Sequence, residues 1–212
     1  MISNNTIKRG SYGLLFIILM WFGTSFSNIS FHILYIIIFV ICIKEMFHLT
    51  KNKNRILGSI YVLIPMIIIH LFDYNNGYNN SLLLFIYILT WTFDTFAYII
   101  GIKIGKHKIF PSISPNKSWE GFFGGWSLTI IACIVTIEFT ELITTLEDIN
   151  PYLIAIILPF TATLGDFIES YFKRQAGVKD SGTFIPGHGG MLDRVDALMI
   201  TIPVLYIYIK LV

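Results

Sequence analysis

A polar segment near the carboxyl-terminal end of the sequence has the residue types of a phosphate and metal site. Residues 170–196 hold four basic residues, three acidic residues, one histidine and five glycines in 27 positions. The segments on either side are almost wholly apolar. Ionisable groups beside a membrane-type segment are costly, so a dense group of them predicts a functional site.

The run that leads into this segment places polar side chains on one helical face. Asp166, Ser170 and Lys173 stand at i, i+4 and i+7, which stacks them on one side of a helix, and Glu169 lies on the same stripe. The carboxylate of Asp166 is expected to face the protein interior, water or a metal. The alternative is a plain ion pair between Asp166 and Lys173 or Arg174.

A second pair of carboxylates follows a glycine-rich stretch. Asp193 and Asp196 are spaced i, i+3 at the start of the last apolar run, just after Gly189 and Gly190. Acids at this position also favour a helix start by capping, which is the alternative interpretation. Glycines ahead of a helix let the backbone N–H groups approach a phosphate closely. His188 fits either a loop hydrogen bond or a phosphate contact.

Together these residues predict phosphoryl chemistry assisted by a divalent cation. Lys179 and Asp180 precede the glycines and Arg194 follows them, so cations and acids alternate along the segment. Mg²⁺ binds through one or two carboxylates plus substrate phosphates, and Asp166 and Asp193 fit that sparse ligand set. The cations suit the phosphate charge.

Two earlier segments add candidate contacts. Asp94 lies in the middle of an apolar run, where an acidic residue is more often functional than structural. Lys117 and Ser118 occupy the next polar segment and suit phosphate oxygens. Ser118 also fits the N-cap position of the following helix, and Trp119 fits an interfacial anchor.

The composition is that of an integral membrane protein. Of the 212 residues, 55% are hydrophobic and only 13% are charged, against roughly 25% in soluble domains. The length suits one membrane catalytic domain over residues 1–212, with amino-terminal spans in 1–80 and the motif-bearing part in 81–212. The two cysteines form no CxxC pair, so neither zinc nor a disulfide framework is indicated. No nucleic-acid partner is expected.

An all-α bundle of about seven membrane spans is predicted to position these residues, because each span needs about 20 mostly apolar residues. No small-residue cleavage site follows the first apolar run, so it is predicted to be a retained span and not a signal peptide. The expected spans are residues 11–27, 29–43, 56–72, 81–101, 119–139, 151–172 and 196–211.

The basic residues predict the orientation of the bundle. With seven spans, all Lys and Arg residues except Lys210 fall on the same side as the amino terminus. The opposite loops, residues 73–80 and 138–150, carry acids and no bases. The positive-inside rule then predicts a cytoplasmic amino terminus, with the polar segment at the cytoplasmic face of the cell (inner) membrane.

These residues resemble the signature of the phosphatidate cytidylyltransferase (CDP-diacylglycerol synthase) family. The family pattern is Ser-x-x-Lys-Arg, four residues, Lys-Asp, then Pro-Gly-His-Gly-Gly and Asp-Arg-x-Asp, and every part is present in residues 170–196. Residues 114–121 resemble a second family motif, and Asp94 with Ala97-Tyr98 resembles a third. The resemblance covers roughly residues 81–200 of the sequence.

The resemblance implies a reaction in which phosphatidate attacks the α-phosphorus of CTP, giving CDP-diacylglycerol and pyrophosphate in phospholipid biosynthesis. It implies Mg²⁺ as a cofactor, held by Asp166 and Asp193, and allows K⁺ beside it and a homodimer. Implied catalytic residues are Asp166, Lys173, Asp180 and Asp193. Implied substrate contacts, each suited to CTP or to the lipid phosphate, are Asp94, Lys117, Ser118, Ser170, Arg174, Lys179, His188, Gly189, Gly190, Arg194 and Asp196.

The sequence departs from the family pattern in two respects. It is shorter than typical members, which carry more spans ahead of the motifs. Asn116 and Ser118 also stand where the family more often has Lys and Thr, which removes one cation near the nucleotide.

Two other functions fit parts of the pattern. One is a CTP-dependent kinase of a polyprenol or a related lipid alcohol, which would release CDP instead of pyrophosphate. The other is a cation-coupled transporter with Asp94 and Asp166 along its pathway. Transport predicts charges spread through the bilayer depth, whereas most charges here gather at one face.

Overall fold

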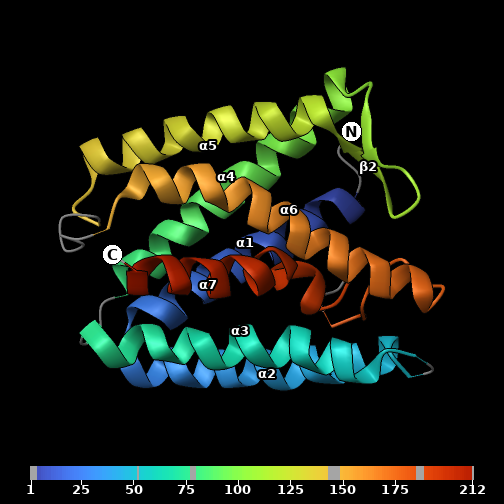
Figure 1. The fold of residues 1–212 in the computed structure, drawn as a ribbon, viewed down its shortest axis with the longest axis horizontal. Helices are drawn as coiled ribbons and strands as arrows, with labels where there is room; N and C mark the ends of the chain where they lie inside the picture. The colour runs from blue at the N-terminus through green and yellow to red at the C-terminus, as the bar shows by residue number, and fades with distance from the viewer. Residues whose placement is uncertain (1–3, 52, 77–79, 143–148, 185–188, 212) are drawn as a thin grey trace.

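The computed structural model describes residues 4–51, 53–76, 80–142, 149–184 and 189–211. Within these ranges the chain forms a bundle of seven helices with one two-stranded hairpin (Figure 1). The elements in order are α1 (Asn4–Ser25), α2 (Asn28–Leu49), α3 (Arg55–Asn76), α4 (Ser81–Ile104), β1 (Lys108–Phe110), β2 (Ser114–Ser118), α5 (Trp119–Phe139), α6 (Pro151–Gln175) and α7 (Leu192–Leu211).

Five of the helices, α2 to α6, are long and apolar enough to cross a membrane, which makes this a multi-pass membrane protein. The apolar part of α1 is shorter, Ser11–Ser25. The expected span at 119–139 coincides with α5, while α2 extends six residues beyond the expected end at 43. The helical class is confirmed; seven crossings remain a prediction.

The polar connections gather at one end of the bundle. The end of α2, the start of α3, the hairpin and the end of α6 all lie at the right of Figure 1. The predicted basic loops therefore lie on a common side. Which side faces the cytoplasm remains a prediction from the charge distribution.

The β1–β2 hairpin was not expected from the sequence. Its strands pair antiparallel, with Lys108 opposite Ser118 and Phe110 opposite Ser114. The strands are too short for a recognisable alternation of apolar and polar residues, and Pro115 argues against a strand. The hairpin matters because it carries Lys117. It leads directly into α5, whose N-cap is Ser118 as predicted: its side chain accepts from the Gly121 N–H at 3.2 Å.

Glycines allow the closest helix contacts. A Cβ on Gly121 would lie 2.6 Å from the Ala97 carbonyl oxygen, and one on Gly125 would lie 3.0 Å from the Phe93 carbonyl oxygen. Their four-residue spacing puts both on one face of α5, so α4 and α5 pack backbone to backbone.

Candidate active site

Three carboxylates from two helices converge near the basic end of the bundle. Asp166 and Glu169 come from α6 and Asp196 comes from α7. One oxygen of each lies within 4.8 Å of the other two, which is close enough for all three to hold one metal ion. Asp166 and Asp196 are half-buried and Glu169 is fully buried.

The close crossing of α6 and α7 brings these acids together. A Cβ on Gly165 would lie 2.2 Å from the backbone oxygen of Asp196, so only glycine allows the helices to meet here. Tyr61, on α3, reinforces the crossing: its hydroxyl lies 2.8 Å from the Gly165 carbonyl oxygen and 3.4 Å from that of Asp196. Asp166 is the residue after Gly165, so its side chain begins beside the place where α6 and α7 cross.

Asp166 is held by two neighbours. Lys117, on β2, forms an ion pair with its Oδ2 at 2.5 Å, and the Ser170 hydroxyl donates to its Oδ1 at 3.1 Å. The Ser170 contact follows the predicted i, i+4 spacing. Asp166 does form an ion pair, but with Lys117 from the hairpin, and not with Lys173 or Arg174 in the part of the chain that is described.

Lys173 joins the two helices through charge. Its ammonium is paired with Glu169 four residues earlier and lies 2.7 Å from Asp193 Oδ1 on α7. All three groups are largely buried, with side chains 11%, 0% and 6% exposed. The Lys173 ammonium thus balances two carboxylates that are largely shielded from water. Removing it would leave both acids buried without their cation, which lowers the stability of the folded chain.

Asp193 is surrounded by hydrogen-bond donors. Besides Lys173, its Oδ2 accepts from the Gly190 N–H at 2.7 Å and the Ser181 N–H at 2.9 Å, and the Ser181 hydroxyl also lies 2.9 Å away. These contacts hold the loop ahead of α7 against the start of that helix. Asp193 lies outside the group of three acids, so its role as a metal ligand stays a prediction.

Glu45, on α2, is a site residue that the sequence did not reveal. Its carboxylate accepts from the N–H groups of Met191 at 3.0 Å and Leu192 at 2.8 Å, which are donors at the start of α7. The Ser181 hydroxyl lies 2.9 Å from Glu45 Oε2, so it touches both Glu45 and Asp193. No sequence signal singled out Glu45, because its partners lie more than 130 positions away.

We expect Glu45→Ala to lower the stability of the folded chain, since each buried donor left unpaired costs about 1–3 kcal/mol. Glu45→Gln keeps one acceptor oxygen and should lose less. Thermal unfolding in detergent measures both, with Glu138→Ala as the control because Glu138 is an exposed acid near the end of α5. Equal unfolding temperatures for Glu45→Ala and Glu138→Ala would contradict this role.

Asp94 belongs to the same charged region. Its electrostatic neighbours are Lys117, Asp166 and Arg194, and it also interacts with Asp196. The mid-helix acid of α4 therefore interacts electrostatically with carboxylates of α6 and α7, and its role as a substrate contact stays a prediction. Lys117 lies among these acids as the opposing charge.

The remaining predicted residues surround this region less tightly. Arg174 is exposed and donates to the carbonyl oxygens of Ile113 at 3.2 Å and Val178 at 2.9 Å, which fixes it beside the hairpin. Lys179 and Asp180 are exposed on the loop after α6, and Arg194 is exposed on the first turn of α7.

The glycine stretch is described in part. Gly189 has φ +84°, a left-handed conformation that favours glycine, and a Cβ there would lie 2.6 Å from Asp193 Oδ2. Gly190 is buried, and its N–H is already bonded to Asp193. His188 lies outside the described residues, so its predicted role is not tested.

The acids fit a divalent cation. Apart from the ion pair with Lys173, the two buried carboxylate oxygens of Glu169 have no hydrogen-bond partner in the described part of the chain. Oxygen ligands at this density suit Mg²⁺, which takes carboxylates together with substrate phosphates. Among the described residues, Asp166, Glu169 and Asp196 form the group of acids able to hold it.

Comparison with known proteins identifies the family. A model of the cytidylyltransferase family matches residues 56–212, which include all the site residues above except Glu45. The chain belongs to the cytidylyltransferase family. The matched part runs from α3 to the end of the chain, so it contains both helices that carry the acidic cluster.

Similar cytidylyltransferases include three staphylococcal proteins named phosphatidate cytidylyltransferase. Those of Staphylococcus epidermidis and Staphylococcus aureus (strain COL) are 39% and 36% identical over 166 residues, covering 75% of this chain and 62% of each relative. That of Staphylococcus saprophyticus is 47% identical over 125 residues, covering 59% of this chain and 47% of the relative. The chain therefore spans about three-fifths or less of the length of these relatives.

Proposed function

We propose that this chain transfers the cytidylyl group of CTP to phosphatidate, giving CDP-diacylglycerol and pyrophosphate. The observation that carries the proposal is the convergence of Asp166, Glu169 and Asp196 beside Lys117 at the polar end of a membrane bundle. Relatives named phosphatidate cytidylyltransferase support the choice of this reaction.

Mg²⁺ is the proposed cofactor, and Asp166 and Asp196 are its proposed ligands, with Glu169 completing the set. When bound, the ion neutralises charge on the phosphates during displacement at the α-phosphorus. A K⁺ ion that accompanies Mg²⁺ is also proposed, and no residues are assigned to bind it. Asp193, with its oxygens engaged by donors, is proposed to hold the glycine loop in place in addition to any ligand role.

The chain's own cations are proposed to bind the phosphates. Lys117 lies at the acidic cluster, and Arg174 extends from the end of α6 toward the hairpin. Lys179 and Arg194 are exposed near them, where a triphosphate has access from water. Such catalysis consists mainly of positioning and charge neutralisation, so it needs no covalent protein intermediate.

An apolar groove beside the cluster suits the acyl chains of a lipid substrate. Its volume is about 520 Å³, and it lies between α3, α6 and the hairpin. Its lining includes Tyr61, Phe110, Phe167 and Phe172. The Lys117 ammonium lies 5.2 Å from the ring centre of Phe167, which lines the groove, so the groove lies next to the cation that pairs with Asp166. A lipid lying in it would present its phosphate to Lys117.

The proposed topology places this site at the cytoplasmic face of the cell (inner) membrane, with all seven helices crossing. Three basic connections at one end of the bundle support that orientation. CTP would then enter from the cytoplasm and the lipid from the bilayer. A homodimer remains a prediction.

The deciding experiment uses the purified chain in phosphatidate-containing micelles with Mg²⁺ and CTP labelled at the α-phosphate. We expect label in a lipid product and stoichiometric release of pyrophosphate. Omitting phosphatidate should stop the release. Label recovered as CDP, with a phosphorylated lipid alcohol, would instead indicate the kinase reaction and contradict the proposal.

A further inference from the structure

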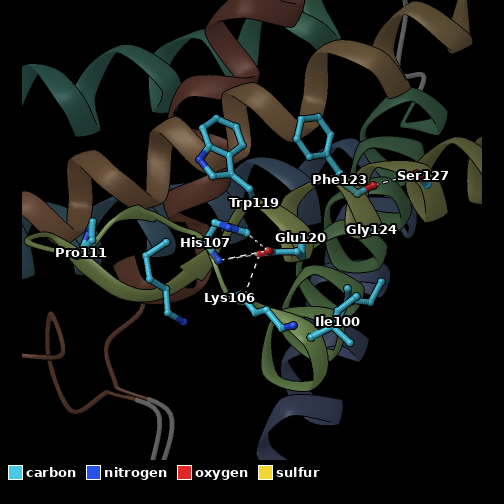
Figure 2. Close-up of a pocket in the computed structure, with 11 residues that line it drawn as sticks. Ile100, Lys106, His107, Pro111, Trp119, Glu120, Phe123, Gly124 and Ser127 are labelled. Carbon is cyan, nitrogen blue, oxygen red and sulfur yellow. Dashed lines mark hydrogen bonds and ion pairs between the residues drawn. The ribbon is translucent and has the colours of Figure 1, made fainter.

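A second hollow also borders the hairpin, and it is separate from the acyl groove. Its volume is about 1190 Å³, and α4, α5 and the hairpin line it. It shares no lining residue with the groove beside Asp166. Figure 2 shows the Glu120–His107 pair inside it, framed by the side chains of Trp119, Phe123 and Ile100.

The hollow is apolar on one part of its wall and basic at its rim. Ile100 and Ile104 of α4 and Phe123 of α5 form the apolar part, and both helices are long and apolar enough to cross the membrane. Trp119 stacks on Phe123 with ring centres 5.8 Å apart, and its place at the polar start of α5 suits an aromatic anchor at the membrane–water boundary. The rim is formed by residues 106–108, Lys-His-Lys.

The one acid among the lining residues is already engaged by hydrogen-bond donors and by His107. Glu120 accepts from the backbone N–H groups of Lys106 at 3.1 Å and His107 at 3.2 Å, and its Oε1 lies 2.6 Å from His107 Nδ1. None of these contacts uses a lysine ammonium. In the described residues neither Lys106 nor Lys108 forms an ion pair; the Lys108 ammonium only donates to the Asn116 carbonyl oxygen at 3.4 Å.

We infer that this hollow binds an anionic phospholipid, with the phosphate at Lys106 and Lys108 and the upper acyl chains against Ile100, Ile104 and Phe123. Basic pockets between membrane helices recognise anionic headgroups in this way. The hollow exceeds the roughly 300–1,000 Å³ of a typical small-molecule site, so it has room for a headgroup and part of its chains. His107, with a side chain 80% exposed, faces the same headgroup region.

This inference does not depend on cytidylyl transfer, because the experiment that tests it measures lipid binding directly. It has a consequence for the hairpin, which also carries the Lys117 that pairs with Asp166. A lipid bound against Lys108 of β1 would stabilise the strand pair that positions Lys117. The lipid composition of the membrane would then affect the acidic cluster at Asp166 without a lipid entering that cluster.

Tryptophan quenching tests the inference, since Trp119 lines the hollow. A single-tryptophan chain, with Trp21, Trp91 and Trp126 changed to Phe, is reconstituted in phosphatidylcholine bilayers. Equal fractions of brominated phosphatidylglycerol or brominated phosphatidylcholine are then added. We expect phosphatidylglycerol to quench Trp119 more effectively, and Lys106→Gln and Lys108→Gln each to reduce its relative affinity about five-fold.

The matched control is Lys103→Gln, an exposed lysine in the last turn of α4 that does not line the hollow. It should leave the preference intact. Native mass spectrometry of the unaltered chain provides a second measurement, the retention of phosphatidylglycerol over phosphatidylcholine. Equal quenching by both lipids, no quenching by either because another polypeptide covers the face, or the same loss in Lys103→Gln would each overturn the inference.

Discussion

Asp166→Asn is expected to abolish product formation while leaving a folded protein in the membrane. The change keeps the size of the side chain but removes the charge that pairs with Lys117 and that a divalent cation requires. Charge stabilisation by a bound metal is worth several kcal/mol, so a loss of about 10³-fold in turnover is expected. Pyrophosphate release with CTP and phosphatidate measures it.

The control for this change is Glu138→Gln, which makes the same carboxylate-to-amide change on an exposed residue near the end of α5. It should retain turnover and the same unfolding temperature. Asp196→Asn is expected to act like Asp166→Asn, and both should weaken the binding of Mn²⁺, used as a spectroscopic substitute for Mg²⁺. Near-normal turnover in Asp166→Asn would defeat the assignment of the acidic cluster.

Lys173→Met is expected to give the largest loss of stability. It leaves Glu169 and Asp193 buried without their shared cation, and breaking a buried ion pair typically costs about 3–5 kcal/mol. The unfolding temperature in detergent should fall, and the retained activity of the folded fraction should fall with it because Asp193 loses a donor.

A double variant separates charge from packing. Glu169→Gln combined with Lys173→Met removes one buried acid together with the cation, so it should recover part of the lost stability. Arg174→Met is the matched control, since Arg174 is the neighbouring exposed cation on α6. If Lys173→Met and Arg174→Met unfold at the same temperature, the buried charge network is not what stabilises this crossing.

The sequence predicted the helices well because each is a long apolar run bounded by polar residues. It also predicted that Asp166 and Ser170 share a face, since that follows from helical spacing alone. The two-stranded hairpin was missed because strands of three and five residues are too short to carry a periodic signal.

The partners of the acids could not be predicted, because they depend on which helices cross. Lys117 reaches Asp166 from a hairpin 49 positions earlier, and Asp196 meets Asp166 because Gly165 allows a close approach. Asp193, predicted as the second metal ligand, stays untested in that role, whereas the packing of α7 puts Asp196 beside Asp166 and Glu169. Helical periodicity predicts which residues share one face of a helix, but it does not predict which other helix packs against that face.

The bond between Glu45 and the start of α7 affects how the chain can be divided. A fragment that begins after residue 80 would contain every signature residue and yet lack the acceptor for the Met191 and Leu192 N–H groups. In such a fragment, the Met191 and Leu192 N–H groups, which follow Gly189 and Gly190, would need another acceptor or would stay without one. We therefore expect a minimal functional version of the chain to include α2, which carries Glu45.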